Sequence, residues 1–366
     1  MHYIIILLAI PLFVYVAFKL FLKAPQFGRL ATGQDLNKIM HSPNYIKGKF
    51  RNRTRVKDHM SFKKIPTLIK QNQEADKQKR PPKLLPISLE ALYRQKQSRD
   101  DIQITWFGHS CILLETDGMR ILIDPMLGNH ASPVPGTVKR FSNMDIDWDR
   151  VEPVDLIVFS HDHYDHLDYG SFLKLKDKTD FIVGPLGIAA HLKYWGFASE
   201  KIHECDWGDS YQYKGVSLVS CPTKHFSGRT PTGRDQCLWC SWVIEVDGKK
   251  LYFSSDSGYS SNFEEIGQKH GPFDLAFMEC GQYNHLWREN HMFPEESLQA
   301  FVDVKAKLML PIHWGGFSLA PHDWREPVER LLAEAKKRNI NDIIFPGLGA
   351  GIVLEKDYPK EMWWKK

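Results

Sequence analysis

The sequence predicts an α/β body of layered, mixed sheets, preceded by an apolar segment and a basic neck. Short β-rich runs recur from residue 102 onward, among them IQITWF, CILLET, RILIDP, DLIVFS, VSLVSC and DIIFPG, and each predicts a strand. Asp-Gly pairs at 117–118 and 247–248 join neighbouring runs as hairpins. Helical patterns lie between other runs, which favours mixed sheets with helices over a purely parallel sheet.

Composition divides the chain into three differently charged parts. The 366 residues are 43% hydrophobic and 25% charged, which excludes a wholly disordered or collagen-like chain. The formal net charge is +4, yet residues 1–18 hold no Lys, Arg, Asp or Glu. Residues 19–100 hold 20 basic and 6 acidic side chains and are therefore strongly basic. Residues 101–366 hold 28 basic and 38 acidic side chains and are therefore acidic. We therefore expect an anchor or signal at 1–23, a basic neck or N-terminal extension at 24–100 and one domain at 101–366.

The apolar run from Tyr3 to Phe18 predicts a membrane anchor. It is barely long enough to span a bilayer, with Lys19 reaching the interface. A cleaved secretory signal is the alternative, although no basic segment precedes the run and no clean cleavage site follows it. A helix buried in the core of the domain is the least favoured interpretation, because the run is apolar on every face and not on one face alone. The Lys and Arg residues after the run place the body on the cytoplasmic side, with a periplasmic or secreted location left open.

The neck, residues 24–100, is rich in Lys, Arg, Gln, Asn and Pro and predicts loops and short helices. One interpretation of the neck is a solvated linker. The other is a segment that contacts anionic lipid, because basic clusters beside a membrane are attracted to such surfaces. We expect no nucleic-acid partner, because no aromatic interleaving or nucleic-acid-binding motif accompanies the charge. The pair Cys237 and Cys240 falls in a predicted strand with no second CxxC, so we interpret it as structural.

Two helices are marked by proline at their starts. Pro294 opens PEESLQAF, with carboxylates in the first turn. The segment from Pro327 to Arg338 carries apolar residues on one face and basic residues in its last turn.

A cluster of His and Asp residues, HDHYDH at 161–166, directly follows the predicted strand DLIVFS. A buried strand would not hold so much charge, so the cluster is expected in a loop at the sheet edge. Imidazole nitrogens and carboxylate oxygens are the ligands of zinc and similar divalent ions. His161 and His163 share one side of the turn and Asp165 and His166 diverge, so one loop can serve two neighbouring metals. A polar surface loop is the alternative, and chance clustering at this spacing is improbable.

Three further metal-capable residues occupy the same kind of position. His225, Asp256 and His313 each follow a β-rich run and precede a glycine or polar turn. A single histidine at a strand end is more often structural. Three such positions in a chain that also holds the cluster favour a shared site.

These residues resemble the metallo-β-lactamase superfamily, whose dinuclear site uses these residue types in this order. Several flanking motifs are similar to one branch, N-acyl-phosphatidylethanolamine-hydrolysing phospholipase D and its bacterial relatives. They are ITWFGHS at 104–110, Asp124-Pro125, YDHLDY at 164–169, FEEIG at 263–267, GPFD at 271–274 and IHWG at 312–315. The resemblance covers about residues 102–350.

The resemblance implies an αββα sandwich of two mixed sheets with helices outside. It implies one metal held by His161, His163 and His225 and a second held by Asp165, His166 and His313. Asp256 would bridge the two. Asp165 and His291 are expected to be catalytic, with His291 polarising the substrate, or else exposed just before a helix. His109 and Asp124 would support the ligands from behind.

The implied function is a zinc-dependent hydrolase of the phospholipase D type. Two zinc ions would hold a shared hydroxide that attacks the phosphodiester of an N-acylated phospholipid and leaves phosphatidic acid. Manganese and iron accept the same ligands. A lactonase or other small-ester hydrolase on the same site is the first alternative, and a non-catalytic membrane-tethered binding protein is the second. The expected partners are a phospholipid and the membrane surface, with the oligomeric state open.

Overall fold

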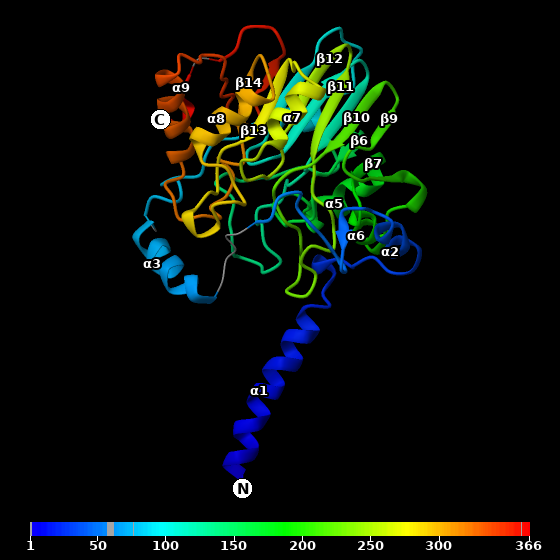
Figure 1. Cartoon of the computed structure of the whole chain (residues 1–366), viewed down its shortest axis with the longest axis vertical. Helices are drawn as coiled ribbons and strands as arrows, with labels where there is room; N and C mark the ends of the chain where they lie inside the picture. Colours follow the sequence, from blue (N-terminus) through cyan, green and yellow to red (C-terminus); the bar gives the residue numbers. More distant parts are fainter. Residues whose placement is uncertain (1, 57–61, 76, 360) are drawn as a thin grey trace.

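The computed structural model describes residues 2–56, 62–75, 77–359 and 361–366. The body is a sandwich of two β-sheets with helices on the outer faces of both (Figure 1). This confirms the predicted layered α/β fold with mixed sheets.

The first sheet has seven strands and mixes both pairing directions. Their order is β15 (Gly351–Val353), β3 (Gln103–Trp106), β4 (Ile112–Thr116), β5 (Met119–Ile123), β6 (Val154–Val158), β7 (Thr179–Pro185) and β8 (Ile202–Cys205). Pairs from β15 to β5 are antiparallel, and those from β5 to β8 are parallel. The β4–β5 pair forms the hairpin expected at Asp117-Gly118.

The second sheet has six strands in the order β14 (Met309–Ile312), β13 (Leu275–Glu279), β12 (Lys249–Phe253), β11 (Ser241–Val246), β10 (Val216–Cys221) and β9 (Ser210–Tyr213). Strands β9 to β12 pair antiparallel, and β12 to β14 pair parallel. The directions place the ends of β10, β12, β13 and β14 at one edge of this sheet. The ends of β3, β5 and β6 share one edge of the first sheet in the same way.

Helices cover the outer faces of the two sheets. Helices α5 (Tyr169–Leu175) and α6 (Ile188–Tyr194) lie on the seven-stranded sheet, and α7 (Asn262–Lys269), α8 (Pro294–Asp303) and α9 (Glu326–Lys337) lie on the six-stranded sheet (Figure 1). The prolines stand in the first turns of α8 and α9, as expected. Pro residues fit there because the first turn has no intrahelical partner for their missing N–H.

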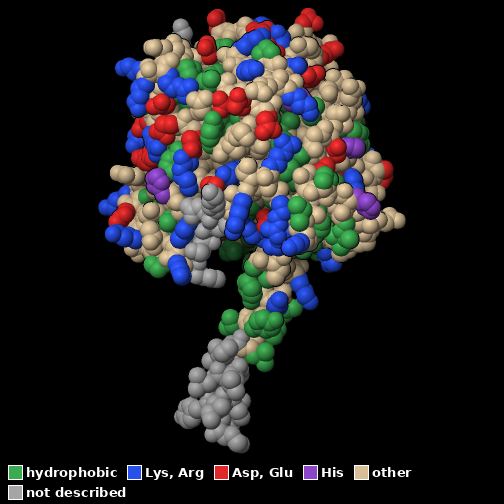
Figure 2. Space-filling model, in the orientation of Figure 1, with side chains coloured by type: hydrophobic (Ala, Val, Ile, Leu, Met, Phe, Trp, Pro, Cys, Tyr) green, Lys and Arg blue, Asp and Glu red, His purple; other side chains and the backbone are tan. Residues whose placement is uncertain are grey.

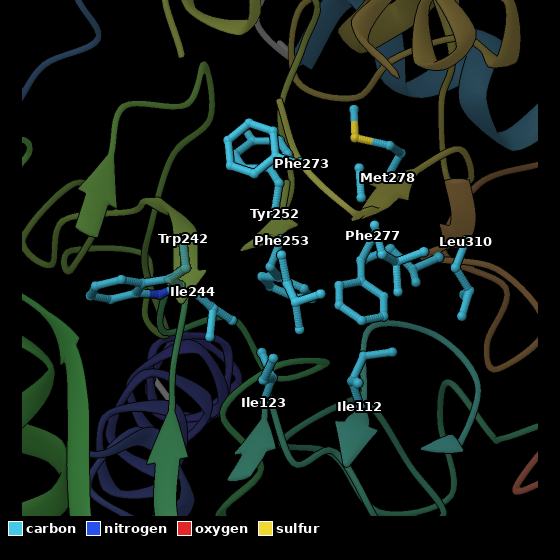
Figure 3. Close-up of a cluster of buried hydrophobic side chains, with 14 of the residues drawn as sticks. Ile112, Ile123, Trp242, Ile244, Tyr252, Phe253, Phe273, Phe277, Met278 and Leu310 are labelled. Atoms are coloured by element: carbon cyan, nitrogen blue, oxygen red, sulfur yellow. The ribbon is translucent and has the colours of Figure 1, made fainter. Parts of the chain in front are cut away.

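Alternation along the strands builds separate apolar layers on the two faces of the seven-stranded sheet. Ile112 and Ile123 point from that sheet toward Phe253 and Phe277 of the other (Figure 3), and all four side chains are fully buried. Leu113, the neighbour of Ile112 along β4, faces outward into the layer under α5 and α6. Side chains of a strand alternate between faces, so β4 is apolar throughout while buried on both sides.

The neck packs against the body at several points. It contains η1 (Pro25–Phe27), α2 (Gly33–Met40), β1 (Tyr45–Ile46), β2 (Lys49–Phe50), η2 (Phe62–Lys64), α3 (Ile65–Ala75) and α4 (Glu90–Tyr93). Ile39 and Phe50 are each 1% exposed and belong to the same apolar cluster as the inter-sheet core. The backbone N–H of Phe50 donates to the carbonyl of Asp235 at 2.9 Å.

Helix α1 (His2–Phe21) extends away from the body (Figure 1). Its apolar side chains from Leu12 to Phe21 are mostly exposed, Phe13 to 73%. Within the part of the chain open to this test, we find no helix with the length and apolar character that crossing a membrane requires.

Two local expectations differ from the structure. The run DIIFPG forms no strand, and only Ile343 makes an isolated bridge, to Met309. Cys237 and Cys240 precede β11, which begins at Ser241. Both cysteines are buried and free of disulfides, in keeping with a structural role.

Candidate metal centre

The candidate site lies where strand ends of both sheets meet. The loop after β6 carries His161 to His166, and Asp168 closes it by capping α5, where its carboxylate accepts the N–H of Ser171 at 2.8 Å. His225 follows β10, Asp256 follows β12 and His313 follows β14. The sandwich therefore brings all seven predicted ligands to one place, although they span 153 positions of sequence.

One group consists of His161, His163 and His225, with Asp256 completing it. Their ligand atoms all lie within 4.8 Å of one another. His161 Nε2 is 2.9 Å from His163 Nδ1, and His225 Nε2 is 3.3 Å from the same atom. The far nitrogens are held from behind: His161 Nδ1 by the Ser160 hydroxyl at 2.9 Å and His225 Nδ1 by the Asn290 carbonyl at 3.0 Å. These contacts fix which ring nitrogen faces the centre.

The second group consists of Asp165, His166 and His313, joined by His109. His109 Nε2 lies 2.7 Å from Asp165 Oδ2, and the rings of His109 and His313 are 4.0 Å apart. His109 and His313 also bind each other's loops, because the N–H of His313 donates to the carbonyl of His109 at 2.8 Å. Both have positive φ, 54° and 64°, a strained conformation that is concentrated at functional sites.

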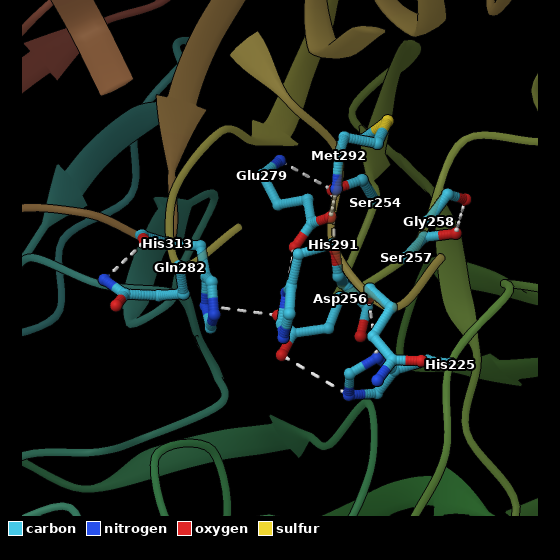
Figure 4. A network of polar contacts seen from close by, with 12 residues as sticks. His225, Ser254, Asp256, Ser257, Gly258, Glu279, Gln282, His291, Met292 and His313 are labelled. Carbon is cyan, nitrogen blue, oxygen red and sulfur yellow. Dashed lines mark hydrogen bonds and ion pairs between the residues drawn. The ribbon is translucent and has the colours of Figure 1, made fainter. Parts of the chain in front are cut away.

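Asp256 lies between the two groups. Its Oδ2 is 3.2 Å from His166 Nε2 and 3.6 Å from His225 Nε2, and its Oδ1 is 3.1 Å from His313 Nδ1. Figure 4 shows His225 and His313 reaching this carboxylate from opposite sides. The position is the one that a bridging ligand requires.

Asp124 supports the second group from behind. Its Oδ2 lies 2.7 Å from His166 Nδ1 and accepts the Ser160 hydroxyl at 2.6 Å. Its Oδ1 accepts the Ser160 N–H at 2.8 Å. A carboxylate on the rear nitrogen of a ligating histidine orients the ring and raises its basicity. Since Ser160 also contacts His161, one buried network braces a ligand in each group.

His291 faces the centre from the segment before α8. Its ring stacks on that of His313 at 5.1 Å, and its Nδ1 lies 2.9 Å from Glu279 Oε2 (Figure 4). Glu279 is fully buried at the end of β13, and its other oxygen accepts the N–H of Met292 at 2.8 Å. Glu279 therefore fixes the direction in which His291 points.

Burial shapes the charge of the site. Burial lowers the pKa values of His161, His225 and His313 well below the usual value, and that of His163 to about 4. These rings are therefore neutral at pH 7, the form that binds metal. At His166 burial also opposes the charged form, but Asp256 and the other nearby carboxylates outweigh it and raise its pKa well above the usual value.

The residues fit a pair of divalent cations. His166 Nε2, His313 Nε2 and Asp256 Oδ1 are buried and make no hydrogen bond among the described residues. The approaches of Asp256 to His166 and His313, at 3.2 and 3.1 Å, are ion-pair contacts without hydrogen-bond geometry. Buried polar atoms without partners are costly, and a cation would satisfy them. Nitrogens bound tetrahedrally to zinc lie about 3.4 Å apart, close to the spacings of 2.9 and 3.3 Å in the first group. His and Asp donors suit zinc, and manganese and iron as well.

Two cavities flank the centre. The larger, of about 800 Å³, is lined by residues 49–56 of the neck and by His225, Phe226 and Asn290 among others. The smaller, of about 180 Å³, is lined by Phe226, Gln282, Trp287, Asn290, His291 and Leu319. Phe226 and Asn290 border both cavities. The larger cavity reaches the candidate ligand His225, and the smaller one reaches His291.

Sequence reasoning missed two contributors to the site. Glu279 stands in a continuous apolar strand, LAFME, where its charge is the only signal. Asn52 stands in the basic neck and contacts His225, 173 positions away. His109, expected to support the ligands, contacts the predicted ligand Asp165 at 2.7 Å and also belongs to the second group of possible ligands.

Comparison with known proteins finds a matching family model and several relatives. The model of the β-lactamase superfamily domain matches residues 119–314. An uncharacterized protein of Mycobacterium tuberculosis is 40% identical over 293 residues, covering 78% of this chain and 77% of its own. N-acyl-phosphatidylethanolamine-hydrolyzing phospholipase D 1 of Caenorhabditis elegans is 28% identical over 274 residues (70% and 77%), and the mitochondrial enzyme of that name from Saccharomyces cerevisiae is 31% identical over 271 residues (71% and 57%).

Solved structures share the fold. The metallo hydrolase Igni18 of Ignicoccus hospitalis aligns with a TM-score of 0.53 at 21% identity, covering 70% of this chain and 99% of its own. An isothiocyanate hydrolase from Delia radicum gut bacteria aligns with a TM-score of 0.54 at 18% identity, covering 68% and 98%. At these identities the likeness concerns the fold alone, and it confirms the αββα sandwich predicted from the sequence.

Proposed function

Because the chain belongs to the β-lactamase superfamily and is a metal-dependent hydrolase, we propose that it is a phosphodiesterase of the phospholipase D type. The proposed substrate is N-acyl-phosphatidylethanolamine or a related phospholipid. The observation that carries the proposal is Asp256 between two groups of ligands, within 3.2 Å of His166 and 3.6 Å of His225. Such a carboxylate suits a site for two cations, and zinc fits the donors.

The relatives support the proposed substrate class. Proteins of worm and yeast named for hydrolysing N-acyl-phosphatidylethanolamine match about 70% of this chain. The ligands alone suit a phosphodiester, an ester or a lactone equally well. The choice of a phospholipid therefore depends on this relationship and on the basic neck beside the site.

The chemistry divides between the cations and the chain. Two bound divalent cations would lower the pKa of a shared water and take up negative charge that develops on the phosphoryl oxygens. Asp256 and the six other ligands would hold the cations in place, and Asp124 and Ser160 keep the rings of His166 and His161 oriented. His291 presents its free ring nitrogen to the substrate, because Glu279 binds the other one.

We also propose that residues 1–23 anchor the enzyme at a membrane, with the body on the cytoplasmic side. The support is the apolar sequence from Tyr3 to Phe18 and the Lys and Arg residues that follow it. An enzyme held in this way would act on lipids of the membrane that anchors it.

Product analysis tests the function. The metal-loaded full-length protein is incubated with N-acyl-phosphatidylethanolamine in detergent micelles, and the lipids are identified by mass spectrometry. We expect phosphatidic acid and N-acylethanolamine to form in equal amounts. Absence of turnover at full metal occupancy would reject the proposal, and faster hydrolysis of a soluble lactone would reassign the site to a lactonase.

A further inference from the structure

The larger cavity is strongly basic and borders the metal centre. Its lining includes five cationic side chains, Lys49, Arg51, Arg53, Arg55 and Arg234, and one carboxylate, Asp235. In Figure 2, Lys and Arg side chains gather around a hollow on the face of the body from which α1 leaves. We call this cavity the basic groove.

The neck forms one wall of the basic groove and is fixed to a metal ligand. Asn52 donates from its amide nitrogen to the carbonyl of His225 at 2.7 Å and accepts the N–H of His225 at 3.1 Å. The indole N–H of Trp239 donates to the same Asn52 oxygen at 3.2 Å. Arg51 and Arg53 stand on either side of Asn52 in the chain, so their positions are tied to that of His225.

Residues of the body that line the basic groove reach the ligands through Phe226. The Arg234 guanidinium lies 4.0 Å from the centre of the Phe226 ring. The same ring packs on His163 at 4.6 Å and on His225 at 4.8 Å between ring centres. Arg234 of the body thus lines the same cavity as the cations of the neck and lies against a ring that contacts two ligands of the first group.

The charge of the basic groove is only partly compensated from within the described residues. Arg53 pairs with Glu265 at 3.2 Å in an exposed ion pair, and Arg234 lies 3.7 Å from Asp235. Burial raises the pKa of Asp235 above its usual value. Several guanidinium groups around one cavity suit a phosphate group, because each can donate two parallel hydrogen bonds to its oxygens.

We propose that the basic groove binds the phosphate monoester that hydrolysis leaves on the lipid, next to the metal centre. The inference rests on the proposed function, because cleavage of a phosphodiester on the alcohol side leaves a monoester with an additional negative charge. The ligand chemistry is a phosphate monoester dianion, whether carried by phosphatidic acid or by a free phosphate ester.

Binding without turnover tests the proposal. Calorimetry measures the affinity of the metal-loaded full-length protein for glycerol 3-phosphate and for phosphatidic acid in neutral detergent micelles. We expect the double variant Arg51→Gln/Arg55→Gln to bind both ligands about tenfold more weakly, because two charge-assisted contacts are lost. The control Lys77→Gln/Lys83→Gln removes the same charge from exposed positions elsewhere in the neck and should change either affinity less than about twofold.

Each possible result of these measurements supports or overturns binding of the phosphate monoester in the basic groove. Equal weakening by the two double variants, or none by either, overturns the proposal, since general charge would then account for binding. Weakening for micellar phosphatidic acid alone also overturns it in favour of attraction to a lipid surface. Circular dichroism and metal content verify folding, and Lys49→Gln/Arg234→Gln replaces the first variant if that one misfolds. Because no step requires catalysis, a failure of the proposed hydrolysis would leave the binding result readable.

Discussion

Asn52 of the neck makes two hydrogen bonds with the backbone of His225. Its side chain donates to the His225 carbonyl at 2.7 Å and accepts the His225 N–H at 3.1 Å. The neck, for which a solvated linker was one of two interpretations of the sequence, therefore helps to position a candidate metal ligand. The Trp239 indole adds a third contact to the same amide. The neck and the metal centre are accordingly one structural unit at this point.

Asn52→Ala is expected to weaken metal binding at the first group of ligands about tenfold, since residues that orient a ligand typically contribute that much. Metal content after dialysis against graded chelator, measured by atomic absorption, gives the affinity. The control Asn37→Ala replaces an exposed asparagine of α2 in the same neck. Unchanged metal affinity in Asn52→Ala would show that His225 holds its position without the neck.

Asp256→Asn is expected to lower metal content and abolish hydrolysis while the fold survives. The substitution keeps the shape of the side chain but removes the negative charge that lies between His166, His225 and His313. Metal analysis, circular dichroism and hydrolysis of the preferred substrate check it, with Asp342→Asn as an exposed control. Wild-type rates in Asp256→Asn would refute the assignment of the site.

Glu279→Gln is expected to lower kcat about tenfold with little change in KM or metal content, because His291 loses the carboxyl partner that orients it. The variant keeps the side-chain volume of a fully buried position. Glu245→Gln, an exposed change on β11, is the matched control. A parallel loss of bound metal would instead identify Glu279 as a ligand.

Much of the site was predictable because its signals are local. The cluster at 161–166 and the placement of His225, Asp256 and His313 after β-rich runs can be read without knowing the fold. The contribution of Asn52 depends on a contact with His225, 173 positions away, which no local pattern encodes. The run DIIFPG fits a strand by composition, yet Ile343 finds only an isolated bridge to Met309. Strand propensity describes how well a segment suits a sheet, and tertiary pairing decides whether the segment forms a strand.

The metal-free protein is expected to lose stability as the pH falls from about 6.5 toward about 4. Burial lowers the pKa values of His109 and His163 to about 4 in the folded state. Between these pH values the unfolded chain binds protons that the folded chain excludes, so acidification favours unfolding. His166, Asp256 and Glu279 have raised pKa values and act in the opposite direction. They are outnumbered by the histidines of the site whose pKa values burial lowers, which are His109, His161, His163, His225, His291 and His313. Melting temperatures of the chelator-treated protein across this range provide the measurement, and a rise on acidification would contradict the expectation.

Deleting residues 1–23 is expected to release the protein from membranes and leave its activity on soluble substrates. The contacts that fix the neck begin beyond the deletion: Trp195 donates to the Pro25 carbonyl at 2.8 Å and Arg229 to the Gln26 carbonyl at 2.7 Å. A longer deletion, of residues 1–28, removes both carbonyls and should lower the melting temperature, because buried Arg229 loses an acceptor. Membrane flotation and hydrolysis of a soluble phosphodiester measure the two properties. If deletion of 1–23 abolished both, α1 would be part of the folded enzyme and not an anchor attached to it.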